Sequence, residues 1–538
     1  MSKQRTLVIG LDGGTFKVID RLIAEGRMPT LERLTREGVR GSLESTIITN
    51  SFPAWTTCTT GVNPGKHGIF YALLRDRTRY GMKLMNSSDV KARRLWDLLN
   101  DAGLTAGIVN VPGTYPPQPL DGYLITDMLT PSLESRLTEP ESLKAEMLDE
   151  IGDYIIDVPI GLGDKDYVRD RLFRSIELRE ELTLWLLDRH PSDFFMCIFT
   201  ELDRCQHRFW NDSDPEHPLF EQGNPYQGVV DDVYARCDQA VGRILEHVGD
   251  DVRVFIVSDH GFAGYRKNVL INHWLIDQGL LVLRDAPAGP TLVERVTGRL
   301  KRMFAPPAPP KDGASYVSKW TNVTNSEHDY LERVDWSKTK VYFAQHGGLR
   351  VNLAGREPHG IVDEAGYADV VAHIRREIVK LRFPDTGEQI FETVVTKEDA
   401  FSGPFLEDAP DILVDGARRT RLRMSLMPGQ GLFVDAVHAG HDELGIFFAT
   451  GPGIKRGIEI EGAKLQDVTP TVLYQFGLPL TEDMDGSVLE EVFTDEFRSG
   501  RTIDRRGTSV LADHSESVYA EDEREELEGR LRDLGYIN

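Results

Sequence analysis

Six side chains of the types that bind divalent metal ions stand at separate points along the chain. They are three aspartates and three histidines: Asp12, Asp203, His207, Asp259, His260 and His441. Carboxylate and imidazole groups together suit zinc or manganese. Six ligands divide naturally into two sites of three. Two ions roughly 3.5–4 Å apart can stabilise both the attacking and the leaving oxygen of an in-line displacement.

Ser51 could supply the nucleophile for such a displacement. Pro53 can open a helix, because its missing N–H is one of the donors left unpaired there, and Gly61 can close it. Ser51 then lies at or just before a helix N-terminus, where backbone N–H groups and the helix dipole favour an anion. A hydroxyl bound to a metal ion there would be a usable nucleophile near neutral pH. The alternative is that Ser51 only caps the helix.

The elements that must position these groups follow an α/β pattern. Short apolar runs at 6–11, 194–199 and 252–257 are typical of buried strands in a parallel sheet, and each leads directly into candidate Asp or His residues. Open α/β sheets bind ligands at the carboxyl ends of their strands. After the strand at 194–199, Asp203 and His207 are four residues apart, so a helix would place both on one face. The alternation of strands with helical segments predicts an α/β fold with a largely parallel sheet.

Composition limits the class of protein. A formal net charge of −24 argues against binding to a nucleic-acid scaffold, because phosphate backbones require a basic surface. The four cysteines show no CxxC spacing and are expected to be reduced thiols. No apolar run of about 18 residues exists, so we expect no membrane span. With no signal-peptide pattern at the N-terminus, we expect a cytoplasmic protein.

The length of 538 residues exceeds one ordinary core. We expect a catalytic domain over residues 1–490 that carries a cap or lid insertion at about 262–345. The Pro-rich piece 305–311 fits a mobile or spacer segment within that insertion. Residues 491–538 read as a charged C-terminal tail with a short amphipathic helix at 523–534, whose leucines would clip it to the body.

The order and spacing of these motifs resemble the alkaline phosphatase superfamily and, within it, the type I phosphodiesterase/nucleotide pyrophosphatase group. The matching segments are Asp12-Gly13, Ser51-Phe-Pro53 with Thr60-Gly61 and His67-Gly-Ile69 behind it, Glu201-Leu-Asp203-Arg-Cys-Gln-His207, Ser258-Asp-His-Gly261 and Gly440-His-Asp442. The resemblance covers roughly residues 5–490. It implies a three-layer α/β/α sandwich with a cap. It also implies that Asp12, Ser51, Asp259 and His260 surround one metal ion, and that Asp203, His207 and His441 hold the other.

The activity implied by this resemblance is that of a two-metal phosphohydrolase with Zn²⁺, or Mn²⁺, as cofactor. It would hydrolyse a diester or pyrophosphate in a small phosphorylated substrate through a covalent phospho-Ser51. Most members of the group carry Thr at the position of Ser51. Many nucleotide pyrophosphatases also have a phosphate-contacting Asn where this chain has Tyr71-Ala-Leu73; Asn86 and Asn110 are candidates to replace it.

Three other functions remain as alternatives. A phosphomonoesterase or phosphomutase could use the same metal site, and a catalytically silent binding protein could keep the fold. A sulfatase is disfavoured, because Trp55 stands where the sulfatase motif has Arg and the ligand set is richer in His. The sequence leaves the oligomeric state open.

Overall fold

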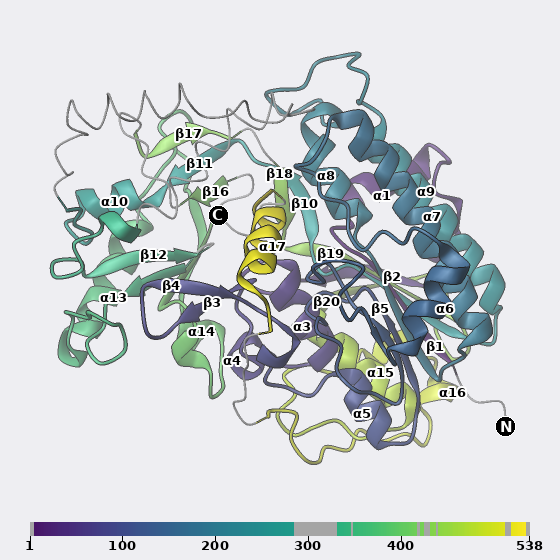
Figure 1. Ribbon diagram of the computed structural model, residues 1–538. Coiled ribbons are helices and arrows are strands. Elements are labelled where there is room, and N and C mark those ends of the chain that lie inside the picture. Colours follow the sequence, from purple (N-terminus) through teal and green to yellow (C-terminus); the bar gives the residue numbers. More distant parts are fainter. Residues whose placement is uncertain are drawn as a thin grey trace.

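The computed structural model describes residues 5–284, 331–345, 348–416, 420–423, 431–436, 439–511 and 518–533 (Figure 1). Among these residues the largest sheet has nine strands, in the order β20-β2-β19-β9-β1-β8-β5-β6-β7. In chain order the strands are β1 (Thr6–Leu11), β2 (Val39–Glu44), β5 (Ala106–Val109), β6 (Gly122–Ile125), β7 (Thr138–Glu139), β8 (Phe194–Phe199), β9 (Arg253–Val257), β19 (Leu444–Thr450) and β20 (Ile458–Lys464).

The centre of the sheet is parallel. Strands β9, β1, β8, β5 and β6 all run in one direction, whereas β19 and β7 are antiparallel to their neighbours. Every residue of β1 and β8 is buried, as expected for strands covered on both faces. The predicted α/β class and the largely parallel sheet are confirmed.

Helices cover both faces of this sheet (Figure 1). Successive side chains of a strand point to opposite faces. Accordingly Leu7 and Ile9 belong to one hydrophobic core, and Val8 between them belongs to another. The first core includes residues of α1 (Phe16–Ala24), α2 (Pro29–Glu37), α7 (Lys165–Arg189), α8 (Glu201–Ser213) and α9 (Val229–Val248); the second includes residues of α3 (Ser51–Thr60), α5 (Leu95–Asp101) and α15 (Val468–Phe476). Two cores on one sheet make a three-layer α/β/α sandwich.

A cap with its own core is inserted between two short strands, β10 (Gly261–Gly264) and β18 (Ala439–Asp442), which pair antiparallel. The chain therefore leaves the body next to His260 and returns to it at His441. The described strands of the cap include β11 (Lys267–Leu270), β12 (Val341–Gln345), β13 (Gly348–Val351), β14 (Phe391–Thr396), β15 (Ile412–Gly416), β16 (Thr420–Arg423) and β17 (Phe433–Asp435); α10 (Ile271–Asp277) and α13 (Glu364–Ile378) accompany them.

The cap core extends well past residue 345, the C-terminal bound expected from the sequence. Strand β15 pairs with both β13 and β14, and residues from Val269 to Val414 share one hydrophobic cluster. We propose that the cap is the whole insertion between β10 and β18. The Pro-rich piece 305–311 lies outside the described residues.

The C-terminal segment packs against the body. In α17 (Glu521–Asp533), Leu527 and Leu531 are 0% and 2% exposed and belong to the first core of the body. Arg530 donates hydrogen bonds to the backbone oxygens of Met128 and Thr130. Leu527 and Leu531 are two of the three leucines in the helix expected at 523–534, and Leu534 lies outside the described residues.

The described residues also bear on the expectations for thiols and membrane spans. All four cysteines are buried and free. None of the helices in the described part of the chain has the length and apolar character needed to cross a lipid bilayer.

Candidate metal centre and nucleophile

The first group of candidate ligands lies at the carboxyl ends of two adjacent parallel strands. Asp12 follows β1, whereas Asp259 and His260 follow β9, and all three side chains are fully buried. The Nε2 atom of His260 lies 3.3 Å from Asp259 Oδ2 and 3.8 Å from Asp12 Oδ1. The candidate ligand atoms of the three residues all lie within 4.8 Å of one another, close enough to share one ion.

The other oxygen of each carboxylate in this group is anchored by the protein. Trp55 Nε1 donates to Asp12 Oδ2 at 2.8 Å, and the backbone N–H of Gly13 donates to Asp259 Oδ1 at 3.3 Å. Asp12 and Asp259 therefore each present the remaining oxygen toward His260. Such outer contacts orient ligands and are part of most metal sites.

The second group joins α8 to β18. Asp203 Oδ1 lies 3.2 Å from His207 Nε2 and 3.4 Å from His441 Nε2, and the two imidazole nitrogens are 3.1 Å apart. Asp203 and His207 share one face of α8, as their spacing predicted. The candidate ligand atoms of this group likewise lie within 4.8 Å of one another. Arg204 donates to Asp203 Oδ2 at 2.7 Å, which leaves Oδ1 facing the histidines.

Hydrogen bonds to backbone oxygens set the tautomers of two of the histidines. His260 Nδ1 lies 2.9 Å from the oxygen of Gly261, and His441 Nδ1 lies 2.9 Å from the oxygen of Thr49. A carbonyl oxygen only accepts, so the proton resides on Nδ1 in both rings. The Nε2 lone pairs of His260 and His441 are then available to a metal ion. Their rings stack with centroids 3.7 Å apart, which brings the two groups side by side.

The electrostatics of this region favour bound cations. Burial raises the pKa of Asp12 well above its usual range, and the charges of Asp259 and Asp203 raise it further. Burial, followed by the charge of Asp203, also raises the pKa of Asp259. Burial lowers the pKa of His260 and holds it neutral, the form that ligates metals. Carboxylates that repel one another, beside neutral imidazoles, fit a pair of divalent cations.

Ser51 lies beside the first group, as the first residue of α3. Its Oγ is 3.1 Å from His260 Nε2 and 3.4 Å from Asp12 Oδ1. The helix cap is Asn50, whose side chain accepts from the N–H of Phe52 at 3.3 Å. The alternative that Ser51 only caps the helix is therefore wrong, and its hydroxyl faces the candidate ligands instead.

The hydroxyls of Thr56 and Thr57, also on α3, make hydrogen bonds within the body. Thr56 Oγ1 donates back to the oxygen of Phe52 at 2.6 Å, as expected for a hydroxyl inside a helix. Thr57 Oγ1 lies 2.9 Å from Nε2 of His67, whose Nδ1 accepts from the N–H of Ile69. His67, in the motif behind the predicted nucleophile, thus fastens the segment after α3 to the helix.

The structure also places the two asparagines considered as phosphate contacts. Asn110 follows β5 with a positive φ of 58°, and its Nδ2 donates to the oxygen of Ile198 at 3.0 Å. Asn86 accepts a hydrogen bond from the N–H of Ser88 and caps a short turn. The Asn86 side chain thus bonds to backbone of its own turn, and the Asn110 side chain bonds to backbone of the neighbouring strand β8.

Sequence reasoning missed Trp55 and Arg204 as partners of the candidate ligands. Trp55 follows Ser51 by four residues, so the period of a helix could have placed its indole on the same face. Arg204 is fully buried beside Asp203, and its Nε donates to Asp157 Oδ1 at 2.8 Å. In the sequence Arg204 stands among other charged and polar residues, so no pattern singled it out for that role.

Comparison with known proteins decides the family. Residues 6–429 match the family model for type I phosphodiesterase / nucleotide pyrophosphatase. The chain belongs to this family. It is accordingly a phosphoester hydrolase, as the motifs predicted. A comparison with curated proteins gives no match.

Solved structures agree with this family at the level of the fold. Murine ectonucleotide pyrophosphatase/phosphodiesterase 5, in an inactive form in complex with AMP, is 14% identical; the match covers 91% of this chain and 100% of that chain, with a TM-score of 0.51. Phosphonoacetate hydrolase from Sinorhizobium meliloti 1021, in complex with phosphonoacetate, is 13% identical; the match covers 87% and 94%, with a TM-score of 0.53. Both similarities place this phosphodiesterase-family chain on an alkaline phosphatase-like fold.

Proposed function

We propose that this protein is a two-metal phosphodiesterase or nucleotide pyrophosphatase-type hydrolase that works through a covalent phospho-Ser51. The observation that carries the proposal is the position of Ser51 Oγ, 3.1 Å from His260 Nε2 and 3.4 Å from Asp12 Oδ1, at the start of a helix. A buried hydroxyl within reach of two candidate metal ligands supports a role in nucleophilic attack.

Each of the two groups of candidate ligands would form one metal site. Asp12, Asp259 and His260, with the Ser51 hydroxyl, would hold one ion; Asp203, His207 and His441 would hold the other. Zn²⁺ is the preferred cofactor and Mn²⁺ the alternative, because both accept mixed imidazole and carboxylate ligands. When bound, two such ions supply positive charge that lowers the pKa of a coordinated hydroxyl and stabilises an oxygen leaving group.

The residues of this chain then divide the reaction into two displacements. Ser51 Oγ gives its proton to solvent and attacks phosphorus, the bond from phosphorus to the leaving oxygen breaks, and that oxygen departs with a proton from solvent. The phospho-Ser51 that forms still carries the other alcohol of the diester. Water then attacks this phosphorus, the bond to Ser51 Oγ breaks, the phosphate monoester leaves, and Ser51 Oγ regains a proton from solvent. The positive end of the α3 dipole stabilises the negative charge on the phosphoryl oxygens in both steps. Trp55 and Gly13 hold the carboxylates of Asp12 and Asp259 in place throughout.

The test is a set of Ser51 variants on a panel of substrates. Ser51→Ala should retain about two metal equivalents by elemental analysis yet lose most of the rate, with the residual rate arising from binding and electrostatics. Ser51→Thr should stay partly active, since it keeps a hydroxyl at the same position. Brief incubation of the unmodified protein with substrate, followed by acid quench, should trap phosphate on the peptide that contains Ser51.

The same panel separates the alternatives. Faster turnover of bis-p-nitrophenyl phosphate than of p-nitrophenyl phosphate supports a diesterase, and the reverse order indicates a phosphomonoesterase or phosphomutase. Cleavage of sulfate esters alone would indicate a sulfatase. An intact fold with no bound metal and no turnover would indicate a silent binding protein. A fully active Ser51→Ala enzyme, or phosphate trapped on Thr56 or Thr57, would overturn the nucleophile.

A further inference from the structure

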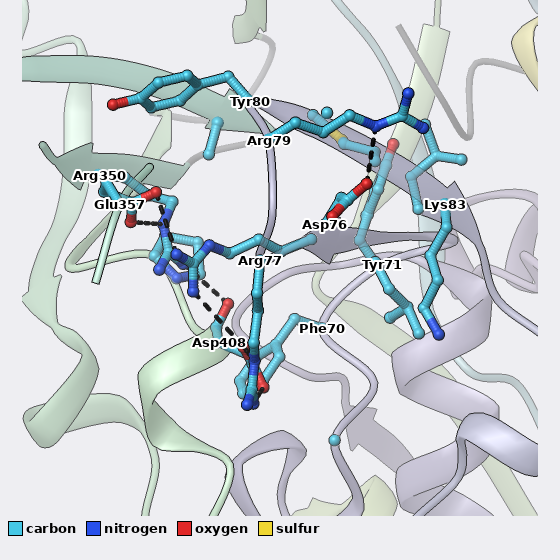
Figure 2. Close-up of a pocket in the computed structure, with 18 of the residues that line it drawn as sticks. Phe70, Tyr71, Asp76, Arg77, Arg79, Tyr80, Lys83, Arg350, Glu357 and Asp408 are labelled. Atoms are coloured by element: carbon cyan, nitrogen blue, oxygen red, sulfur yellow. Dashed lines mark hydrogen bonds and ion pairs between the residues drawn. The ribbon is translucent and has the colours of Figure 1, made fainter. Parts of the chain in front are cut away.

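A pocket of about 440 Å³ lies between the body and the cap. One wall is the hairpin formed by β3 (Leu73–Asp76) and β4 (Gly81–Leu84), and another comes from cap residues that include Tyr342 and Arg350 (Figure 2). This volume is within the range of sites for small organic ligands. None of the candidate ligand residues lines this pocket, and neither does the candidate nucleophile Ser51.

The hairpin that forms one wall is docked firmly in the cap. The ring of Tyr80, at the tip of the hairpin, stacks on Trp336 with centroids 3.4 Å apart, and its hydroxyl donates to Asn352 Oδ1 at 2.5 Å. Arg75 Nη2 reaches Glu357 Oε2 at 3.1 Å and also donates to the backbone oxygen of Arg356. The pocket therefore has preformed walls rather than walls that a ligand must first assemble.

The lining carries an excess of positive charge in a chain whose net charge is −24. Six cationic side chains face four carboxylates: Arg75, Arg77, Arg79, Lys83, Lys91 and Arg350 against Asp76, Asp89, Glu357 and Asp408. Arg75 and Arg350 of the lining both contact Glu357, and Arg356 contacts it as well, so three guanidinium groups share one carboxylate. At the rim, Arg77 pairs with Asp408 and Arg79 pairs with Asp76 (Figure 2).

Apolar and aromatic groups complete the lining. Phe70, Tyr71 and Phe405 are buried, and Leu73 and Met82 of the hairpin line the same pocket. Apolar walls with a few placed charges are typical of sites for small amphipathic ligands. The lining therefore suits an aromatic or apolar body that carries an anionic group.

The pocket lies against the segment that carries the nucleophile. Ile48 lines it, the backbone oxygen of Thr49 holds His441 Nδ1, and Ser51 follows. Three residues of extended chain span at most about 11 Å, so the Cα atoms of Ile48 and Ser51 are no farther apart than that. A short segment of chain thus joins the pocket to the candidate nucleophile, which favours the pocket as the site for another part of a substrate bound at Ser51.

We propose that this pocket binds the leaving portion of the substrate, and that this portion is an aromatic or apolar alcohol bearing its own negative charge. The proposal rests on the proposed diester hydrolysis at Ser51. Residues at the interface between the β3–β4 hairpin and the cap would then determine which substrates bind. The arginines of the lining would recognise the charge of the leaving portion.

The test compares two diesters that differ only in that charge: methyl 3-carboxyphenyl phosphate and methyl 3-carbamoylphenyl phosphate. The variant is the pair Arg77→Gln and Arg79→Gln, whose side chains are 59% and 68% exposed and so can change without disturbing the core. The matched control is Arg36→Gln, since Arg36 is also 68% exposed in an ion pair but lies on α2.

The rim variant should lower kcat/KM for the carboxylate substrate by about 3- to 10-fold, because two cations are lost from the rim and Asp76 and Asp408 each lose an ion-pair partner. The carbamoyl substrate should lose much less, under about 2-fold, because it carries no charge for the arginines to recognise, and the loss with the carboxylate substrate should shrink at high salt. Arg36→Gln should change neither substrate. Equal changes with both substrates, or no change with either, would overturn the role of the pocket.

A binding measurement separates failure of this proposal from failure of the proposed function. Calorimetry with 3-hydroxybenzoate on Ser51→Ala protein should show binding that the rim substitutions weaken, whether or not any diester is hydrolysed. Binding that does not compete with diester turnover would indicate a separate effector site and overturn the leaving-portion assignment. If 3-hydroxybenzoate does not bind to Ser51→Ala protein, the proposal that the pocket binds such a ligand is wrong, even if diesters are cleaved.

Discussion

The two groups of candidate ligands differ in burial and in charge. Asp12, Asp259 and His260 are fully buried and carry two carboxylates to one imidazole. The other group carries one carboxylate to two imidazoles, and the side chains of His207 and His441 are each 9% exposed. The guanidinium of Arg204 bonds directly to the single carboxylate of that second group.

These differences imply different tasks for the two sites. Two carboxylates attract a cation more strongly than one, and a buried site exchanges its ion more slowly. The first group also contacts Ser51, so it would hold a resident ion that activates the nucleophile. The second group, closer to solvent and with its negative charge reduced by Arg204, would hold an ion that exchanges more readily.

The largest effect should follow from removing a ligand of the buried group. Asp259→Ala takes one of two carboxylates from the first site and should lower kcat by more than about 100-fold, beyond the 10–100-fold typical of outer-sphere changes. Elemental analysis should show loss of the first ion. If the variant kept two equivalents of metal and its full rate, the assignment of this group would fail.

A ligand change in the second group should be easier to reverse. His207→Ala should lose the second ion at ordinary metal concentrations and keep the first, so about one equivalent should remain. Activity should recover when Zn²⁺ is added in excess, because the remaining ligands still attract an ion. Asp259→Ala serves as the matched comparison, and equal recovery of both variants would contradict the difference between the groups.

Arg204 should act as a positioning residue for the second group. Arg204→Lys keeps the charge but removes the planar fork that joins Asp203 to Asp157. We expect the affinity for the second ion to fall by about 10- to 100-fold, with the first ion retained. Competition with a chelator measures both affinities separately. A purely structural role would instead lower thermal stability and leave the two affinities unchanged.

Substitution of His67 should have the smallest effect on metal content, because His67 is a buried histidine outside both groups of candidate ligands. Burial lowers its pKa to about 3, so the folded protein holds it neutral. Its unfolded form takes up a proton near pH 6.5; stability should therefore fall as the pH decreases from about 6.5 to 3, by up to about 5 kcal/mol. His67→Asn should flatten this fall and keep both ions, as followed by denaturant unfolding across that range. Loss of metal in this variant would contradict a structural role.

Much of the site could be predicted because local sequence encodes it. The residues at 12, 259 and 260 each end an apolar run, and parallel strands bring their carboxyl ends to one edge whatever the rest of the chain does. The i, i+4 spacing of Asp203 and His207 needs only a helix. In contrast, His441 lies 181 residues beyond His260, and only motif resemblance grouped it with Asp203 and His207.

The parts that could not be predicted depend on contacts between distant segments. The cap strands β14 and β15 are short; within the described residues β14 pairs with β15 and β15 with β13, so no periodic pattern marks where the cap ends. Strand β2 buries every second residue, but one of these is Gly41, whose missing side chain weakens the alternation of apolar and polar residues that would mark a strand. The anchoring of Asp12 by Trp55 requires knowledge of how α3 packs on β1.

The sheet order has a consequence for synthesis of the chain. Strand β2 ends at Glu44, but its two partners are β19, which begins at Leu444, and β20 beyond it. During translation at about 5–20 residues per second, β2 waits about 20–80 s with both edges unpaired. An unpaired strand is a template for aggregation, so the nascent chain needs protection during that interval. Ribosome-bound chains that stop before residue 444 should therefore bind chaperones far more strongly than chains that extend past 464.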